Sequence, residues 1–380
     1  MKEVICVIAD GYPFKESNHC VFVRDLVVEL ARKNVECFVI VPQMMMSNKQ
    51  YLPYTWDDEV DGVTIRVYAP KYRAFSSKPG LMAITMRNHR NTVMRVIEKE
   101  KLNPTVYYGH FLYLNGLTAT FLATRSGLKS IIACGENTNR LLPNSKPYAT
   151  GRKYHGWKRI LSKTDGYICV SKENKRLLIE SGFISEDKRT CVIPNAVNTD
   201  VFKPLNRDSI RKELGIQESD FVVAFTGAFI QRKGNQRVDE AAVGLNGVKT
   251  LFIGGGEFSP KSDCIYCGSV KHDLIPYYLS AADVFVLPTT GEGCCNAIIE
   301  AICCGLPIVS SKGKFNDDLL NDTYSLRVDP LSVSEIKEAI LKLRCDKDLH
   351  DEMKKNTLLA AKSFSLSERA QRVLNFIKGV

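Results

Sequence analysis

Residues 283–309, DVFVLPTTGEGCCNAIIEAICCGLPIV, constrain the fold more than any other segment of this chain. An apolar run ends at Pro288, and an apolar stretch with helical spacing ends at Gly305, a residue that tolerates the left-handed conformation after a helix. The segment therefore predicts a strand, a polar loop, a helix and a second strand, over 283–287, 289–293, 296–304 and 307–309. This order is the repeating unit of a parallel α/β sheet, in which ligands bind at the carboxyl ends of the strands.

Two carboxylates in this segment, Glu292 and Glu300, lie on either side of the predicted helix N-terminus. At a helical rise of about 1.5 Å per residue they would lie roughly 10 Å apart, which is about the distance from a sugar to a ribose across a diphosphate. Free N–H groups near Cys294, Cys295 and Asn296 would hold the diphosphate between them. Taken alone, two glutamates at this spacing are more often a loop carboxylate and a solvated helix position.

The length and composition predict a globular protein of two domains. A chain of 380 residues exceeds one ordinary core, and 44% hydrophobic with 25% charged residues is typical of a folded protein. No apolar run approaches the roughly 18 residues of a membrane span, and the first residues enter a strand-like run that meets Asp10, unlike a signal peptide. Thirteen cysteines in so long a chain are expected to be reduced thiols, which predicts a cytoplasmic protein.

The net charge of +10 lies almost entirely in residues 1–200, and its densest tract is 140–163. That tract has no Asp or Glu, and its basic and aromatic residues are Arg140, Lys146, Tyr148, Arg152, Lys153, Tyr154, Trp157, Lys158, Arg159 and Lys163. Such a tract suits an anionic membrane surface or a phosphate-bearing acceptor, or it is simply a solvated basic face. We do not expect nucleic acid as a partner, because no nucleic-acid-binding motif accompanies the charge.

The first strand, helix and strand, over 4–8, 21–33 and 37–41, lack the G-x-G-x-x-G loop of dinucleotide-binding enzymes, which argues against a dehydrogenase. Two later strands, 105–108 and 130–134, run directly into polar residues. His110 follows the first of them, and Glu136 and Asn137 follow the second. We expect these side chains at the ligand-binding edge of the sheet, although a lone histidine is more often structural.

The 283–309 segment resembles the E-x7-E signature of the GT-B glycosyltransferases of family 4, the retaining group 1 enzymes. The family pattern reads aDvfvlPs…EgfgnvilEAmacGlPVV, and Glu292 and Glu300 stand in its two glutamate positions. Residues 191–204, CVIPNAVNTDVFKP, are similar to the family's viPNGvD…F.P, and 227–234, GAFIQRKG, to its GR….KG. The N-terminal element YP…N…FV…L…L matches Tyr12, Pro13, Asn18, Phe22, Val23 and Leu26.

The chain departs from the family pattern in several of these segments. Ala228 stands at the arginine position of GR….KG, and Arg232, next to Lys233, is the candidate replacement for the missing charge. Cys294 and Cys295 replace the usual residues after the first glutamate. The N-terminal loop ends at Cys20 without the glycines that many members carry there.

The resemblance implies a role for each of these residues. Lys233, Arg232 and the N–H groups at Cys294, Cys295 and Asn296 would stabilise the leaving diphosphate. Glu300 would bind the ribose hydroxyls and Glu292 the sugar hydroxyls, while His110 would bind the transferred sugar from the other domain. Gly268 and Thr290 would complete the donor site, and Glu136, Asn137 and Asn18 would lie on the acceptor side.

The resemblance also implies the architecture. We expect an α/β protein with the GT-B fold, in which two Rossmann-like domains with parallel sheets face each other across a cleft. Residues 1–200 would form the acceptor-side domain and 201–365 the nucleotide-sugar-binding domain. Residues 366–380 would form a helix that crosses back to the first domain.

The implied function is that of a retaining glycosyltransferase, of the hexosyltransferase type (EC 2.4). It would move a sugar from a nucleotide-diphosphate sugar to a lipid-linked, saccharide or other hydroxyl acceptor in surface polysaccharide or glycolipid biosynthesis. No cofactor and no metal are expected, and the enzyme would be cytoplasmic and peripheral on the inner face of the cell membrane. The alternatives are a GT-B nucleotide-sugar epimerase, which needs no acceptor, and a non-catalytic donor-binding partner of another transferase, which releases no diphosphate.

Overall fold

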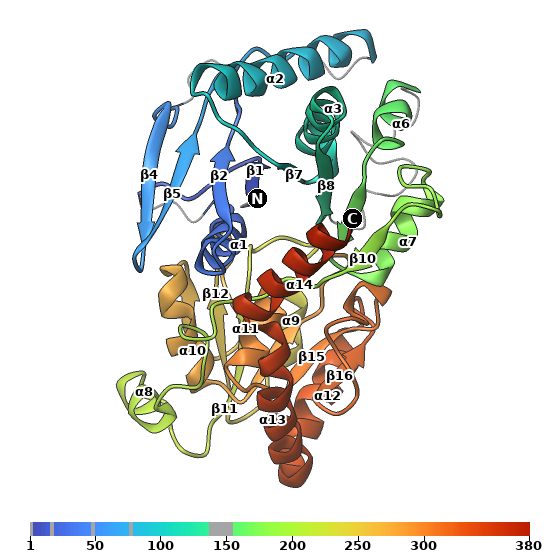
Figure 1. Ribbon diagram of the computed structural model, residues 1–380. Coiled ribbons are helices and arrows are strands. Elements are labelled where there is room, and N and C mark those ends of the chain that lie inside the picture. The colour runs from blue at the N-terminus through green and yellow to red at the C-terminus, as the bar shows by residue number, and fades with distance from the viewer. Residues whose placement is uncertain (1–2, 16–18, 47–49, 76–78, 137–154) are drawn as a thin grey trace. The chain divides into compact units, whose positions relative to one another are not determined.

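The chain divides into two compact units (Figure 1). The computed structural model describes residues 3–15, 19–46, 50–75, 79–136 and 155–380. The N-terminal unit consists of Met1–Pro194 together with Leu366–Val380, and the C-terminal unit is Asn195–Ser365. Each unit has a sheet and a hydrophobic core of its own, so each is built as a separate α/β layer structure.

The N-terminal unit contains an eight-stranded sheet in the order β10-β9-β8-β7-β1-β2-β5-β4. Its strands are β1 (Val4–Ile8), β2 (Glu36–Ile40), β4 (Thr55–Val60), β5 (Val63–Tyr68), β7 (Val106–His110), β8 (Lys129–Cys134), β9 (Gly166–Cys169) and β10 (Thr190–Val192). Its helices are α1 (Val21–Arg32), α2 (Pro79–Lys99), α3 (Leu117–Ser126), α6 (His155–Leu161), α7 (Lys172–Glu180) and α14 (Leu366–Gly379). All neighbouring strands are parallel except β4, which pairs antiparallel with β5.

Alternate residues of β1 supply two different cores, because successive side chains of a strand point to opposite faces of the sheet. Ile5 and Val7 pack in one cluster with residues of α1 and α14, such as Val373. Cys6 and Ile8 pack in another cluster with residues of α2 and α3. Both faces of the strand are therefore covered by helices, as the continuous apolar run of residues 4–8 predicts.

Local hydrogen bonding fixes two further parts of this unit. Ser171 is the N-cap of α7, where its Oγ atom accepts a hydrogen bond of 3.1 Å from the N–H of Asn174. An antiparallel hairpin is formed by β4 and β5, which are joined by a turn at Asp61 and Gly62. Two short strands flank this hairpin in the sequence, β3 (Gln43–Met44) before it and β6 (Lys71–Tyr72) after it, and they pair in parallel with each other.

The expectation that Trp157 belongs to a basic surface tract is wrong. Its side chain is fully buried among the rings of Tyr113 and Phe183, and its Nε1 atom lies 3.2 Å from the sulfur of Met86. Indole is the largest apolar side chain, so a short helix such as α6 is anchored by burying it. The residues of the tract up to 154 lie outside the described residues.

The C-terminal unit contains a six-stranded, wholly parallel sheet in the order β13-β12-β11-β14-β15-β16. Its strands are β11 (Phe221–Thr226), β12 (Val248–Ile253), β13 (Cys264–Gly268), β14 (Val284–Leu287), β15 (Ile308–Ser311) and β16 (Ser325–Val328). Its helices are α8 (Arg207–Glu213), α9 (Asn235–Ala242), α10 (Ile275–Ala281), α11 (Asn296–Cys303), α12 (Val333–Cys345) and α13 (Lys347–Ala361). The chain builds the sheet outward from β11 to one edge, then returns to the middle at β14 and builds toward the other edge.

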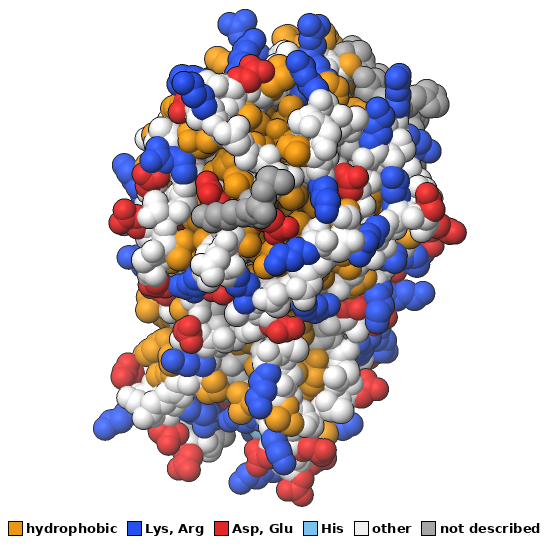
Figure 2. Space-filling model, in the orientation of Figure 1, with side chains coloured by type: hydrophobic (Ala, Val, Ile, Leu, Met, Phe, Trp, Pro, Cys, Tyr) orange, Lys and Arg blue, Asp and Glu red, His pale blue; other side chains and the backbone are white. Residues whose placement is uncertain are grey.

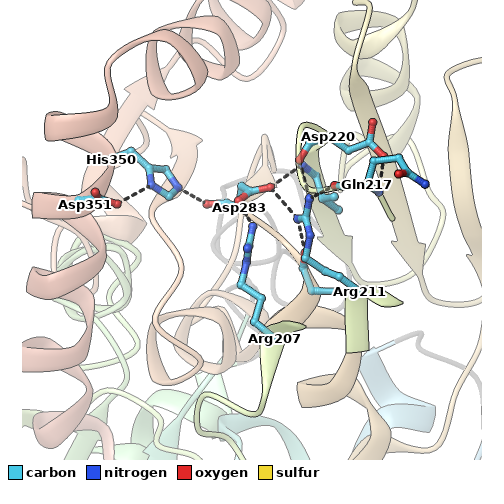
Figure 3. Close-up of polar contacts among 9 residues, drawn as sticks. Arg207, Arg211, Gln217, Asp220, Asp283, His350 and Asp351 are labelled. Carbon is cyan, nitrogen blue, oxygen red and sulfur yellow. Dashed lines mark hydrogen bonds and ion pairs between the residues drawn. The ribbon is translucent and has the colours of Figure 1, made fainter. Parts of the chain in front are cut away.

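Asp283, just before β14, joins several elements of this sheet through its carboxylate and its carbonyl (Figure 3). The carboxylate accepts hydrogen bonds from Arg207 (2.5 Å) and Arg211 (3.2 Å) of α8 and from the N–H of Val222 in β11 (2.7 Å). Its carbonyl oxygen lies 2.9 Å from Nε2 of His350 in α13. Asp283 precedes the strand, at the end of β14 away from the predicted site, so this network fixes the scaffold.

Candidate active site

The loops that follow β11 and β14 meet where the order of the sheet reverses. The two strands are direct neighbours in the middle of the sheet. Because the chain leaves them toward opposite edges, their carboxyl ends form the topological switch point of the sheet, which is where α/β sheets bind ligands. The loop after β11 carries Arg232 and Lys233, and the loop after β14 carries Glu292.

Glu292 gathers three donors onto one oxygen atom. Its Oε1 atom lies 2.6 Å from Nη1 of Arg232 and 2.7 Å from Nζ of Lys233, and it accepts a 2.9 Å hydrogen bond from Oγ1 of Thr289. Arg232 also donates to the carbonyl oxygen of Gly291 at 2.7 Å. The structure thus brings together the two cations and the first glutamate that the sequence predicts, and Arg232 lies beside Lys233 on the same carboxylate.

The environment keeps Lys233 charged. Burial acts to lower its pKa, but the neighbouring Cys295 and Glu292 outweigh burial and raise the pKa of Lys233 above its usual value. The Sγ atom of Cys295 lies 4.0 Å from Nζ of Lys233, and burial raises the pKa of this thiol to about 11. The thiol is therefore neutral near pH 7, and the local charge consists of two cations against one carboxylate.

The backbone of the Lys233 loop requires glycine at the next position. Gly234 has φ +83°, and a Cβ atom there would lie 2.8 Å from the carbonyl oxygen of Pro288. Arg237, in the first turn of α9, donates to the same carbonyl oxygen at 2.9 Å, and the N–H of Thr290 donates to the carbonyl oxygen of Arg232 at 3.0 Å. The two loops are thus joined backbone to backbone, which fixes the direction of Lys233.

The helix after Glu292 begins at Asn296, with Cys295 as its N-cap in an extended conformation. An α-helix leaves its first N–H groups without intrahelical partners, and this end carries the positive part of the helix dipole. The side chains there face Asn195, whose N–H lies 3.3 Å from Sγ of Cys294 and whose amide donates to Oδ1 of Asn296 at 2.8 Å. Any contact of Cys294 and Asn296 with a diphosphate would therefore be made by their backbone.

Glu300 is buried rather than solvated, with 6% of its surface exposed. It lies in the second turn of α11, and its Oε1 atom is 2.9 Å from Nε2 of His272, in the short 3-10 helix His272–Leu274. The helix begins at Asn296, midway between Glu292 and Glu300 in the sequence. The expected rise of about 1.5 Å per residue therefore applies to only half of the residues that separate the two glutamates. The sequence analysis missed His272, although a histidine four residues beyond the end of β13 was a usable signal.

Gly268 is the last residue of β13, and its carbonyl oxygen accepts a 2.8 Å hydrogen bond from the N–H of Gly254. A Cβ atom at Gly268 would meet the hydroxyl of Tyr266 at 3.2 Å. The residue therefore lies at the carboxyl edge of the C-terminal sheet, the same edge as Lys233 and Glu292.

In the N-terminal unit, His110 is the last residue of β7, whereas the sequence predicted it just after the end of this strand. It is 5% exposed, and neither of its ring nitrogens has a hydrogen-bond partner among the described residues. The rings of Phe22 and Phe111 lie 5.0 and 4.8 Å away. Burial, reinforced by the positive charge of Arg369, lowers the pKa of His110 to about 3, so the imidazole is neutral near pH 7.

The turn after His110 is strained and braced. Phe111 and Leu114 have φ of 73° and 56°, in the region that favours glycine. Glu136, 5% exposed, accepts a 2.5 Å hydrogen bond from the N–H of Leu112, and Asn115 donates to the carbonyl oxygen of His110 at 3.1 Å. Glu136 therefore contacts the turn that follows His110. The other two acceptor-side candidates, Asn137 and Asn18, lie outside the described residues.

Comparison with protein families accounts for most of the chain. The family model described as "Glycosyltransferase Family 4" matches residues 21–201, and the model described as "Glycosyl transferases group 1" matches residues 206–359. The chain belongs to the family 4, group 1 glycosyltransferases. It is a GT-B protein and a transferase enzyme, with the two-domain α/β organisation and parallel sheets described above.

Individual relatives show the range of the family. A putative teichuronic acid biosynthesis glycosyltransferase, TuaC, of Bacillus subtilis (strain 168) is 25% identical over 339 residues, 84% of this chain and 83% of that protein. A UDP-Gal:alpha-D-GlcNAc-diphosphoundecaprenol alpha-1,3-galactosyltransferase of Escherichia coli is 25% identical over 229 residues, 55% of this chain and 59% of that protein. The structure of sucrose-phosphate synthase from Thermosynechococcus elongatus has a TM-score of 0.80 at 18% identity, covering 100% of this chain and 99% of the other.

Among the residues that the structure describes, no helix is both long enough and apolar enough to cross a bilayer. Three cations of the basic tract are described, Lys158 and Arg159 in α6 and Lys163 just after it, and all three are exposed.

Proposed function

We propose that this glycosyltransferase transfers a hexose-type sugar, with retention of anomeric configuration, from a nucleoside diphosphate sugar to a hydroxyl group. The observation that carries the proposal is the convergence of Arg232 and Lys233 on Glu292, at the sheet reversal and beside the start of α11. A pair of cations beside a helix N-terminus is arranged to hold a dianionic diphosphate. Retention is supported by the E-x7-E spacing of Glu292 and Glu300.

The chemistry of the transfer follows from this charge arrangement. As the bond between the sugar and the diphosphate breaks, negative charge grows on the leaving oxygen. Lys233, Arg232 and the N–H groups of the first turn of α11 would stabilise this charge. Because the charge is larger in the transition state than in the bound donor, the stabilisation would accelerate the transfer. These groups belong to this chain, so we propose that transfer needs no metal ion and proceeds in excess chelator.

Three further side chains would position the donor. Glu300, buried beside His272, would accept hydrogen bonds from the ribose hydroxyls. Glu292 would release its cations to the diphosphate and accept from the sugar hydroxyls. His110 is neutral, and its two buried nitrogens have no partner among the residues that the structure describes, so it can donate one hydrogen bond to the transferred sugar and accept another from it.

The acceptor class is proposed from the relatives. The Bacillus subtilis relative is named for teichuronic acid biosynthesis, and the Escherichia coli relative for UDP-Gal and a diphosphoundecaprenol acceptor. We propose a UDP-sugar donor and a lipid-linked or saccharide acceptor in surface polysaccharide or glycolipid assembly. A lipid-linked acceptor places the enzyme at the cytoplasmic face of a membrane as a peripheral protein.

The test is thermal stabilisation by UDP, GDP, ADP and their sugars, measured on the wild type, Lys233→Ala and Glu300→Ala. We expect one nucleotide to raise the melting temperature of the wild type selectively, and both substitutions to abolish the shift. Lys249→Ala is the matched control, because Lys249 forms an ion pair with Asp263 near the amino end of β12, away from the carboxyl edge of the sheet. If no nucleotide shifts the wild type, the proposed donor site is wrong.

The second stage measures transfer with the selected donor and a panel of saccharide and lipid-linked acceptors. The anomeric proton coupling of the product, compared with that of the donor, shows whether configuration is retained. Inversion would contradict the retaining mechanism while leaving the donor site intact. Conversion of the donor without any acceptor would instead identify an epimerase.

A further inference from the structure

An exposed apolar patch lies on the N-terminal unit, outside the residues assigned to the donor. Six of the fourteen large hydrophobic side chains that are exposed in the described chain belong to it, each between 37% and 54% exposed. They are Met44, Met45, Met46, Phe75, Leu81 and Ile84. A soluble monomer rarely gathers so many exposed apolar side chains without a binding role.

Strand pairing and hydrogen bonds bring the three sequence segments of the patch together. Met44 pairs with Tyr72 in the short β3–β6 ladder, and the N–H of Met45 donates to the carbonyl oxygen of Tyr72 at 2.8 Å. The N–H of Phe75 donates to Oγ1 of Thr85 in α2 at 2.8 Å. Leu81 and Ile84, three residues apart, share the face of the same helix at its start.

The patch is framed by cations. From residue 62 to residue 97 the sequence contains seven Lys or Arg and no Asp or Glu. Lys71, Arg73 and Arg87 are exposed, and none of the three is tied to a carboxylate in the part of the chain that the structure describes. Lys71 instead lies over the ring of Tyr51, 4.2 Å from its centroid. Figure 2 shows Lys and Arg side chains gathered over α2, with hydrophobic side chains exposed among them.

The patch lies on the same edge of the sheet as His110. β2, β5 and β7 are parallel members of one sheet, and the segments 43–46 and 71–75 follow the carboxyl ends of β2 and β5. On the side of the patch, the ring of Tyr72 lies 5.0 Å from that of His89, whose Nδ1 atom lies 2.9 Å from Oγ1 of Thr118 in α3.

We propose that this patch docks the enzyme on an anionic lipid bilayer, with the methionine, phenylalanine, leucine and isoleucine side chains among the headgroups and the cations on lipid phosphates. The patch combines exposed apolar side chains with three cations that are tied to no carboxylate among the described residues, and residues 62–97 contain no Asp or Glu. An acid of a neighbouring segment, Asp10, lies near Tyr72 and accepts a hydrogen bond from Asn115. The excess of positive charge beside apolar side chains is complementary to a negatively charged lipid surface. Docking in this way would present the His110 edge to an acceptor anchored in the membrane. The role of the acceptor rests on the proposed function, but the docking itself does not.

The experiment is co-sedimentation of the full chain with vesicles of phosphatidylcholine, alone or mixed with phosphatidylglycerol, at low ionic strength. We expect binding only to the anionic vesicles. Arg73→Gln with Arg87→Gln should weaken it about 30-fold, which is about 1 kcal/mol for each charge near an anionic surface. Met45→Ser with Phe75→Ser should weaken it at least about tenfold, because both side chains leave the headgroup layer.

Two control variants make the result specific. Leu331→Ser removes a more exposed apolar side chain, 67% exposed, from the C-terminal unit and should leave vesicle binding unchanged. Lys158→Gln with Arg159→Gln neutralises exposed cations of α6 and should weaken binding less than the Arg73 and Arg87 pair. Melting temperature and stabilisation by UDP are measured on every variant, so that unfolding is recognised.

Three outcomes would overturn the proposal. The first is that the wild type does not bind anionic vesicles. The second is that both patch variants bind the vesicles as tightly as the wild type. The third is that the α6 variant weakens vesicle binding more than the Arg73 and Arg87 variant does. A specific protein complex that the patch variants abolish, without vesicle binding by the wild type, would assign the patch to a protein partner. Because vesicle binding needs no nucleotide, failure here leaves the donor-binding test intact, and failure of UDP binding leaves the docking result intact.

Discussion

Replacing Glu292 by glutamine should make the enzyme bind UDP more tightly while it transfers sugar more slowly. In the structure the Glu292 carboxylate lies 2.6 and 2.7 Å from the two cations that would hold the donor diphosphate. It therefore competes with the diphosphate for Arg232 and Lys233. Glutamine has nearly the same volume, and its carbonyl oxygen can still accept from Thr289, so the loop should keep its shape.

The magnitude follows from the two ion pairs. Hydrogen bonds between charged groups contribute about 1.5–3 kcal/mol each when buried, and much less when solvent reaches them. The side chains of Arg232 and Lys233 are 32% and 16% exposed. Because solvent screens both ion pairs, we assign about 0.5–1 kcal/mol to each of them. The dissociation constant of UDP should then fall about 5- to 30-fold.

The assay is isothermal titration calorimetry with UDP, followed by transfer kinetics with the UDP-sugar. Transfer by Glu292→Gln should fall about 10- to 100-fold, because an amide accepts a weaker hydrogen bond from the sugar than a carboxylate does. Glu300→Gln is the matched control, since the same chemical change at the proposed ribose ligand should weaken UDP binding. If Glu292→Gln binds UDP no more tightly than the wild type, the carboxylate does not compete with the diphosphate and the reasoning fails.

Three other measurements test separate parts of the structure. Lys233→Ala should weaken UDP binding about 10- to 100-fold by calorimetry, through loss of a charged hydrogen bond to the diphosphate. Asp283→Ala should lower the free energy of unfolding by about 3–5 kcal/mol in denaturant titrations, because it leaves the buried cation of Arg211 unpaired, whereas Asp351→Ala, at an exposed carboxylate, should cost little. The pKa of His110 falls from 6.5 to about 3 on folding, so the unfolded chain binds more protons between those pH values and stability is lost as pH falls through that window. His110→Gln should therefore show a shallower loss of melting temperature between pH 7 and pH 4.

The parts of the site that sequence reasoning located are those set by local pattern. The apolar run of β14 is continuous, as a buried parallel strand requires, so its carboxyl end could be read directly from the chain. Gly305 was predicted to end the helix after Glu292, and its φ of +81° confirms the left-handed conformation that glycine adopts without strain. What these positions share is that neighbouring residues in the sequence determine their structure.

Other features depend on contacts between distant segments and could not be predicted from pattern. The partner of Glu292 is set by how two loops about 60 residues apart meet, and nothing in either loop alone pairs Arg232 with that carboxylate. The burial of Trp157 is a similar case, because a tract of basic residues looks like a surface until the packing of Tyr113 and Phe183 is known. From the sequence, Glu300 could be either a ligand or a solvated side chain. Its contact with His272 could not be predicted, because it depends on where the segment after β13 lies in the fold.

The structure around His110 is energetically costly, and this cost supports a functional role for the residue. A buried imidazole whose two nitrogens have no partner among the described residues costs free energy. The positive φ values of Phe111 and Leu114, which follow it, cost about 1–3 kcal/mol each. A fold selected for stability alone would remove both costs with an apolar residue at 110 and glycine in the turn. The braces from Glu136 and Asn115 hold this unfavourable arrangement in place instead. Under the proposed function, a sugar hydroxyl would restore hydrogen bonds to His110, and the N-terminal unit would recover this cost only when the substrate is bound.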